Sequence, residues 1–530
     1  MSRAPPKRSR PDGAPDGRRP RRAAGGPTGR EPRRGGRTRG APARRPRGAP
    51  NGLRAALRRV PAAAWTCALI ALLNAAAWSV ITPPFQGKDE VDHFSYIAQL
   101  AERGTLPHET SGGEYPPHEA LAMRALHYYG VRFTPAAHTI STAAEQRAVN
   151  EAIHAAVPPT ASGNAGVATP EPPLYYALAS IPYALGGGNV LTQLQLIRLL
   201  GALLAALTAL LVFLFLREIL PAVPWAATAG ALCVAVQPLF GFISGSVNPE
   251  TLLVTLTAAL LLCLARALRR GLTPRLAVAL GLLIAAGFAT KLNFIGPAFG
   301  VGVGLLALAV REVRARGWRA LARPALAAGI GLLPVVTVYA ARPQGISTGV
   351  TGQLFSPALL KELSYTWQLY LPRLPGMPHY FAGIATWRDI WFDRAVGLYG
   401  WMDTVFPGWV DDVALVVATA LAGLAARELY VRRAALRARL AELVTYAAVV
   451  FGVLVLMGFA SYQTDAVGHE LAFGEPRYLL PLLPLLGAVI ALAVRGAGRR
   501  WAPVAGAAVV VLFLGHDLFS QLQVIARYYG

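Results

Sequence analysis

The sequence predicts an all-α membrane protein that crosses the bilayer about eleven times and has two large extracytoplasmic loops. The chain has 530 residues, of which 54% are hydrophobic and only 15% are charged. Its apolar residues are concentrated in runs about as long as a helix needs to cross the hydrocarbon core. These runs lack the period-two alternation of a membrane β-barrel, so each is predicted to be a helix.

The first 60 residues differ from the rest of the chain. They contain 19 Lys and Arg against 3 Asp and Glu, many Pro and Gly, and almost no large apolar side chains. Such a segment cannot build a core, so we expect residues 1–60 to form a disordered cytoplasmic tail. A basic tail can bind anionic lipid or nucleic acid, but we expect no nucleic-acid partner. Residues 61–530 are predicted to form one transmembrane domain.

The transmembrane domain contains eleven apolar runs, at residues 61–81, 193–216, 224–243, 250–268, 275–291, 293–310, 324–341, 412–429, 442–460, 477–494 and 501–518. Arg and Lys mark the cytoplasmic side of a membrane protein. If every run crosses the bilayer, the basic tail and four Arg-rich connections all fall on one side. We therefore expect a multi-pass protein of the plasma membrane, with its N-terminus cytoplasmic and its C-terminus extracytoplasmic.

Two long connections, residues 82–192 and 342–411, fall on the opposite side. The first holds ten Asp and Glu against five Lys and Arg. It also contains PPLYYALASIPYAL, residues 172–185, which is apolar but short. Counting it as a span would place every later basic connection on the wrong side. We therefore predict a juxtamembrane or re-entrant helix there.

The acidic stretch KDEVDHF follows the first run almost immediately. It places Asp89, Glu90 and Asp92 within four residues, with His93 beside them. A helix over 88–101 would put Asp89, Asp92 and His93 on one face and apolar side chains on the other. This pattern predicts an amphipathic helix lying on the membrane, with its acidic face turned to a cavity or to water. The alternative is an ordinary helix start, where acidic residues favour the helix dipole.

A carboxylate at the outer membrane surface can act as a general base. It would take a proton from an acceptor hydroxyl or amine while a neighbouring site holds the leaving group. Asp89 and Glu90 are the catalytic candidates, and the same two carboxylates could bind a divalent cation. Asp92 and His93 would contribute to substrate binding, His93 by orienting a carboxylate or adding a nitrogen ligand.

Further candidates lie at the predicted outer ends of other runs. In SVNPETL, Asn248 and Glu250 would line the rim of the same cavity, although Asn248 could equally cap the next helix. Lys291 is a lone cation near the outer end of its run, where it could bind a phosphate or extend to the interface. In GEPRYLLPLLP, Arg477 beside Tyr478 suits recognition of a phosphate. The alternative for Arg477 is pairing with Glu475.

The order of these motifs carries a resemblance. PFQGKDEVDHF, EPPLYYALASIPY, SVNPETL, KLNF and GEPRYLLPLLPLLG resemble a bacterial family of predicted membrane proteins of unassigned function, over roughly residues 61–495. An acidic pair after the first span and a large outer loop are also similar to the GT-C superfamily, multispanning glycosyltransferases that use polyprenyl-phosphate sugars. The resemblance implies a GT-C-like fold with Asp89 as base or metal ligand and Glu90 as the second candidate. The related family often has Pro where Val91 stands, which leaves open which acid faces the cavity.

We therefore predict a glycosyltransferase that moves a sugar from a polyprenyl-phosphate carrier to an extracytoplasmic acceptor in the cell envelope. The acceptor could be a cell-wall glycan, a lipid-linked glycan or a protein, and membrane lipids would surround the chain. One alternative is a transporter or flippase of lipid-linked sugars, with its charges at mid-membrane on broken helices. Another is a non-catalytic scaffold for envelope assembly. Candidate residues at the outer edge favour the transferase.

Overall fold

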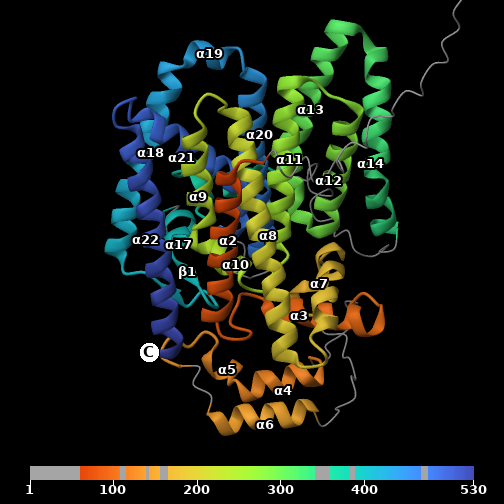
Figure 1. The fold of residues 1–530 in the computed structure, drawn as a ribbon, viewed down its shortest axis with the longest axis vertical. Coiled ribbons are helices and arrows are strands. Elements are labelled where there is room, and N and C mark those ends of the chain that lie inside the picture. Colours follow the sequence, from red (N-terminus) through yellow and green to blue (C-terminus); the bar gives the residue numbers. More distant parts are fainter. Residues whose placement is uncertain are drawn as a thin grey trace, which may run out of the picture. The chain divides into compact units, whose positions relative to one another are not determined.

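The structure is a computed structural model that describes residues 60–107, 115–138, 142–154, 165–340, 359–381, 388–466 and 475–530. The basic tail predicted over residues 1–60 lies, apart from Val60, outside the described residues. The described chain from Val60 onward is almost entirely helical (Figure 1), which confirms the predicted all-α class.

Nine helical segments in the described ranges are long and apolar enough to cross a membrane. They are built from α2 (Ala62–Ile81), α8 (Val190–Ile219), α11 (Glu250–Arg270), η2 (Leu292–Phe294) with α13 (Ile295–Arg316), η3 (Trp318–Leu321) with α14 (Ala322–Ala340), α18 (Gly408–Val431), α20 (Leu440–Ala466), η5 (Pro476–Leu482) with α21 (Leu483–Gly496), and α22 (Ala502–Tyr529). The chain is therefore a polytopic membrane protein.

The two remaining apolar runs are helical but do not meet the length of a straight span. Helices α9 (Pro224–Ala235) and α10 (Pro238–Ser244) meet at a bend of 56°, and α12 (Pro274–Thr290) has 17 residues. The bend falls where Pro238 begins α10 and the Gln237 side chain accepts from the Phe240 amide, because proline cannot continue the preceding hydrogen-bond ladder. The described residues thus hold nine spans, or ten with the bent pair, and the predicted count of eleven is not confirmed.

The Arg-rich connections meet at one end of the helices, the upper end in Figure 1, where α19 (Arg433–Arg437) lies. Arg269 at the end of α11 pairs with Glu442 of α20 at 3.0 Å and donates to the Ile219 carbonyl of α8 at 3.0 Å. Arg495 of α21 pairs with Glu428 of α18 at 3.0 Å. The alternation read from the charges therefore agrees with the arrangement of the helix ends.

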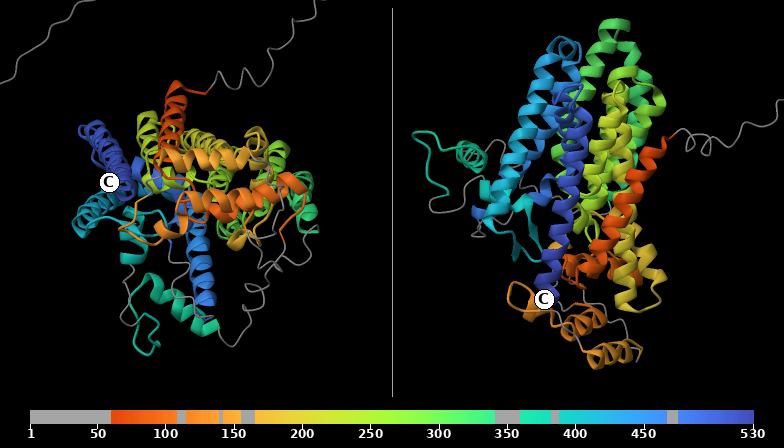
Figure 2. Two further views of the ribbon diagram at one scale, coloured as in Figure 1. Left: turned by 90° about the horizontal axis from the view of Figure 1, so that it is seen from below. Right: turned by 60° about the vertical axis from the view of Figure 1, so that its left-hand side comes forward.

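The first long connection folds at the opposite end, where the C-terminal end of α22 also lies (Figures 1 and 2). It contains α3 (Glu90–Arg103), α4 (Pro117–Ala125), α5 (Tyr128–Val131), α6 (Ala143–His154), η1 (Gly166–Ala168) and α7 (Leu174–Leu185). Arg527 of α22 donates to the Val131 carbonyl at 3.1 Å and pairs with Asp403 at 2.8 Å, which fastens these elements to the last span. Helix α7 has 12 residues, too short to cross, as predicted for residues 172–185.

Helix α3 differs from the prediction of an amphipathic helix lying on the membrane. Both of its faces are buried from Glu90 to Gln99. Phe94 and Ile97 join a core that includes Tyr176 of α7 and Leu194 of α8. Because α7 and η1 pack directly on α3, its polar face lies inside the protein rather than in bulk water.

The second long connection is partly described. It contains α16 (Leu359–Tyr370), the π-helical turn η4 (Arg388–Asp393), α17 (Arg394–Val396) and a two-stranded antiparallel hairpin, β1 (Leu398–Tyr399) and β2 (Thr404–Val405). The hairpin is a small departure from the all-helical prediction. Tyr399 anchors it, since its ring lies 5.2 Å from that of Trp78 in α2 and its hydroxyl donates to Ser520 of α22 at 2.8 Å.

Candidate active site

The turn between α2 and α3 determines where the acidic residues point. Phe85 and Asp89 both have positive φ, 64° and 58°, in the left-handed region that few non-glycine residues adopt. Gly87 lies so close to the 246–248 segment that an added Cβ would be 2.6 Å from Cβ of Ser246. The turn is thus pressed against the chain between α10 and α11, which holds the two consecutive acids, Asp89 and Glu90, in fixed and different directions.

Glu90 is fully buried and bonded to Arg198 of α8. The Arg198 guanidinium donates to both Glu90 oxygens, at 2.8 and 2.5 Å, and the Val247 amide donates to the same carboxylate at 2.9 Å. Arg198 also donates to the carbonyls of Ser79 and Thr82 at 2.9 and 2.7 Å, where α2 ends. This is a bidentate ion pair with its remaining donors satisfied, so Glu90 is engaged in holding the turn.

Asp89 points to a different cation. Its carboxylate accepts from Arg477 at 2.7 Å and lies 3.6 Å from Lys88, and it makes no capping bond to α3. Arg477 also pairs with Glu475 at 2.6 Å. Burial alone would raise the pKa of Asp89, but the charges of Arg477 and Lys88 outweigh it and hold that pKa well below its ordinary value. Asp89 is therefore ionised at neutral pH.

Lys291 lies in the same cluster, between two further carboxylates. It ends α12 in extended backbone, and its ammonium is 3.2 Å from both Glu250 at the start of α11 and Glu171 just before α7. The Tyr478 ring lies near both cations, with its centroid 5.8 Å from Lys291 and 5.1 Å from Arg477. The structure thus brings together five of the sequence-predicted residues: Asp89, Glu250, Lys291, Arg477 and Tyr478.

Asp92 and His93 have hydrogen-bond partners within the first long connection, and these partners are not cations of the cluster. Asp92 accepts from the Tyr115 hydroxyl at 2.8 Å and the Val167 amide at 3.3 Å, and burial raises its pKa. His93 Nδ1 is 2.9 Å from the Tyr176 hydroxyl. Burial, reinforced by the nearby Lys291 charge, lowers the pKa of His93 to about 3, so its imidazole is neutral at physiological pH.

Asn248 lies one residue before Pro249, the N-cap of α11, and contacts the start of that helix as its alternative prediction expected. Its side-chain oxygen accepts from the Glu250 amide at 2.9 Å at the start of α11. Its side-chain nitrogen is buried and has no hydrogen-bond partner among the described residues. Asn248 therefore fixes the backbone that carries Glu250, and it leaves one donor inside the protein.

Four residues of the site were not identified from the sequence. Arg198 pairs with Glu90, and Glu171 pairs with Lys291. Glu475 is predicted from the sequence only as an alternative partner of Arg477, with which it does pair. Trp401, in the β1–β2 hairpin, is buried, donates to the Phe85 carbonyl at 3.3 Å and lies 5.0 Å from Lys88. A lone Arg inside an apolar run was the available signal for Arg198. No local signal marks Trp401, because the hairpin that places it comes from a distant loop.

A small cavity borders the cluster. It has a volume of about 20 Å³, room for a single water molecule, and Lys88, Glu475, Arg477, Gly400 and Met402 contribute to its wall. The described residues contain no group of three His, Cys, Asp or Glu side chains arranged to hold a metal ion. Asp89 and Glu90 each face an arginine instead of each other, so their arrangement does not fit a shared cation.

The fold defines a multi-pass helical membrane protein, with a buried cluster of charged residues at one end of its helices. The chain belongs to the family of predicted membrane proteins DUF2142, whose family model matches residues 72–486. The match confirms the resemblance to a family of predicted membrane proteins. No curated protein matches the chain.

Three solved structures resemble the chain at low identity. ArnT from Cupriavidus metallidurans, bound to undecaprenyl phosphate, is 14% identical with a TM-score of 0.43, over 88% of this chain and 74% of ArnT. The Archaeoglobus fulgidus oligosaccharyltransferase is 14% identical with a TM-score of 0.40, over 88% and 56%. The arabinosyltransferase EmbB from Mycobacterium smegmatis is 15% identical with a TM-score of 0.34, over 92% and 43%.

Replacing Glu90 by Gln should strongly destabilise the protein. The change leaves the buried Arg198 guanidinium without its counter-charge, and breaking a buried pair in this way costs about 3–5 kcal/mol. Thermal unfolding in detergent would measure the loss as a lower Tm. Glu151→Gln on exposed α6 is the matched control and should melt like the wild type. A Glu90→Gln protein with an unchanged Tm would show that the Arg198–Glu90 ion pair does not stabilise the fold.

His93 should make the protein less stable in mild acid. Its folded-state pKa of about 3 lies below the ordinary value of 6.5, so the unfolded chain binds the proton first. The stabilisation is complete above pH 6.5 and decreases as the pH falls towards 3, by about 2 kcal/mol between pH 7 and pH 5. Comparing Tm at pH 7 and pH 5 for wild type and His93→Gln measures it. The wild type should lose more, and equal losses would show that His93 titrates normally.

Proposed function

We propose that this protein is a GT-C-type glycosyltransferase that moves a sugar from a polyprenyl-phosphate carrier to an extracytoplasmic acceptor of the cell envelope. The proposal places it in the plasma membrane with its N-terminus cytoplasmic. One observation carries it: an ionised carboxylate, Asp89, is hydrogen-bonded to Arg477 and lies in one cluster with Lys291, at the end opposite the basic connections. A base beside phosphate-binding cations is what transfer from a phosphate carrier requires.

The cluster is occupied by its own ion pairs when no donor is bound. Within the described residues, Lys88, Lys291 and Arg477 face the carboxylates of Asp89, Glu171, Glu250 and Glu475. These charges sum to −1. An incoming phosphate would therefore have to displace carboxylates from the cations, with Arg477 and Lys291 as its partners.

That exchange would also activate Asp89. Arg477 now holds the pKa of Asp89 low, which makes its carboxylate a weak base. Once Arg477 turns to the donor phosphate, the pKa of Asp89 rises towards its ordinary value and the carboxylate can take the acceptor proton. The acceptor oxygen or nitrogen bonds to the anomeric carbon, the bond between that carbon and the phosphate oxygen breaks, and polyprenyl phosphate leaves with the electron pair.

The cavity beside the cluster must become larger before a donor can bind and react. A cavity of about 20 Å³ holds one water molecule and no sugar. The β1–β2 hairpin, which supplies Gly400 and Met402 to the cavity wall and Trp401 above Lys88, is the element whose displacement would enlarge it. The acceptor could be a cell-wall glycan, a lipid-linked glycan or a protein.

One observation favours the alternative of a lipid-linked sugar transporter. Helices α9 and α10 form a broken segment with a bend of 56°, and broken helices are common in transporters. The charged cluster, however, lies at the ends of the helices and not midway along them. The assays below separate the two functions, because a transporter binds the donor without releasing polyprenyl phosphate from it.

Asp89→Asn should abolish transfer while leaving the fold intact. Asn keeps the shape and tolerates the positive φ at this position, but it cannot accept the proton. We expect release of free polyprenyl phosphate from a panel of polyprenyl-phosphate sugars, with envelope extract as acceptor, to fall by about 10²–10⁴-fold. Tm and Glu151→Gln serve as controls. Equal release by wild type and variant would remove Asp89 from catalysis, and donor binding without any release would favour the transporter.

Loss of Lys291 should weaken donor binding, whereas loss of Glu250 should not. Glu250→Gln removes a competitor for Lys291 and should leave the KM for the donor unchanged or lower. The double variant Lys291→Gln with Glu250→Gln removes the buried pair together and should raise that KM about tenfold, with a smaller effect on kcat. Steady-state kinetics over donor concentration measure both. An unchanged KM in the double variant would place the phosphate elsewhere.

A further inference from the structure

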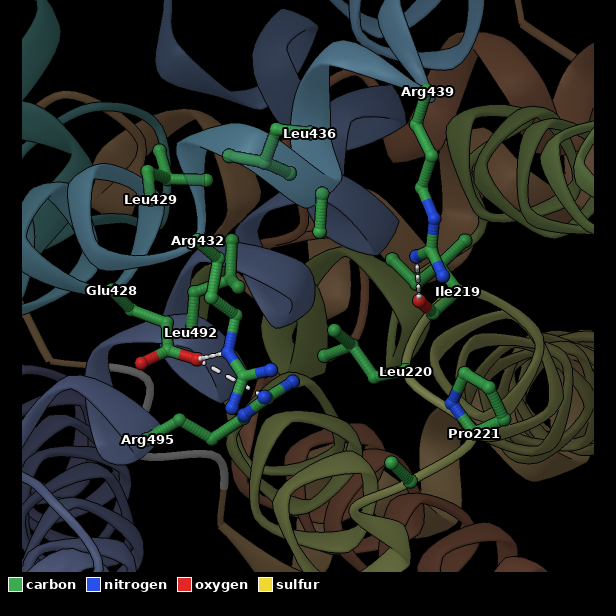
Figure 3. Close-up of a pocket in the computed structure, with 12 residues that line it drawn as sticks. Ile219, Leu220, Pro221, Glu428, Leu429, Arg432, Leu436, Arg439, Leu492 and Arg495 are labelled. Carbon is green, nitrogen blue, oxygen red and sulfur yellow. Dashed lines mark hydrogen bonds and ion pairs between the residues drawn. The ribbon is translucent and has the colours of Figure 1, made fainter.

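A second pocket with several cations lies at the opposite end of the helices, among the Arg-rich connections. It has a volume of about 140 Å³ and is formed where the end of α8, the end of α18, the α19 region and α21 meet. Figure 3 shows Arg432 and Arg495 side by side on one flank and Arg439 on the other, with Leu220 and Leu436 between them. Nothing in the proposed transfer reaction uses this pocket.

The cations of the pocket outnumber its carboxylates. Arg432 and Arg495 share one carboxylate, Glu428, which lies 3.0 Å from Arg495 and also bonds to Arg432. Arg439 donates to the Ile219 carbonyl at 3.2 Å, and no carboxylate pairs with it in the described part of the chain. Three guanidinium groups and one carboxylate leave a net charge of +2. An anion would complete this arrangement, and guanidinium groups bind phosphate oxygens in pairs.

The rest of the lining is apolar, and the pocket borders surfaces that face lipid. Leu220, Leu429, Leu436 and Leu492 form its floor. Only 6% of the apolar stretch of α18 is buried within the protein. Val416 and Tyr430 on that helix are 70% and 68% exposed. In a membrane protein such a face contacts acyl chains, so a lipid could enter the pocket sideways from the bilayer.

We propose that this pocket binds the headgroup of an anionic phospholipid. The phosphodiester would lie between Arg432 and Arg439, and the glycerol and upper acyl carbons would cover the leucine floor. Basic pockets between transmembrane helices on the cytoplasmic side suit such headgroups. A lipid satisfies the charges and the apolar lining together, whereas a free phosphate or a soluble acidic peptide would leave the leucines in water. The bound lipid would hold α8, α18 and α21 together at this end.

The test uses the full chain purified in detergent and offered phosphatidylglycerol or phosphatidylcholine, with bound lipid counted by native mass spectrometry and Tm recorded in parallel. The pocket variant is Arg432→Gln with Arg439→Gln. It should fold, because Arg495 still pairs with Glu428 and Arg269 still donates to Ile219. The matched control is Arg499→Gln with Arg500→Gln, which removes the same charge from the same end without touching the pocket.

We expect wild type and control to retain phosphatidylglycerol in preference to phosphatidylcholine and to melt at a higher temperature with it. The pocket variant should bind phosphatidylglycerol roughly tenfold more weakly and lose the shift in Tm. Equal retention by the pocket variant would overturn the proposal, and so would an equal loss in the control, which would indicate diffuse attraction to the basic surface. Inorganic phosphate should neither raise Tm nor displace the lipid, and a full Tm shift with phosphate alone would replace the lipid by a soluble anion.

Discussion

The buried pair of Arg198 and Glu90 is the interaction on which the candidate site depends. Two charges removed from water carry a large desolvation cost, which is offset only when geometry and hydrogen bonding are nearly complete. Here the pair is bidentate, and the guanidinium also bonds to carbonyls at the end of α2. One arginine on α8 therefore fixes where the first span ends and where α3 begins. The turn that carries Asp89 lies between these two fixed points.

As a consequence, the two adjacent acids have different partners and different roles. Glu90 is held inside by Arg198, while Asp89, in the left-handed conformation, points to Arg477. Residues that are neighbours in sequence thus meet cations from α8 and η5, which are far apart along the chain. The ion pairs of Asp89, Glu250 and Glu171 hold the cations in place without a ligand. In the proposed reaction, the donor phosphate would therefore enter a site that is already organised and exchange one anion for another.

The arginines at the two ends of the helices differ in how completely carboxylates balance their charge. At the acidic end, the cations are balanced by carboxylates and covered by the β1–β2 hairpin. At the basic end, three arginines around an apolar pocket have a single carboxylate between them. The paired charges of the acidic end suit the proposed reaction, in which a donor phosphate replaces carboxylates at the cations. The excess positive charge of the basic end suits the proposed, permanently bound anionic lipid. The two sites share no side chain, so variants of one leave the residues of the other unchanged.

The sequence alone predicted the helical class, the apolar helices, and the gathering of the Arg-rich connections at one end of them. It could do so because hydropathy and charge act locally, and each run or connection can be judged without its neighbours. It also marked Asp89, Lys291 and Arg477, since charges beside apolar runs stand out. The tertiary structure decided which acid meets which cation, that α3 is buried on both faces, and that Trp401 covers the turn. Those outcomes depend on contacts between residues far apart in the chain and on the left-handed backbone at Asp89, one residue before α3 begins. No local pattern encodes either of them.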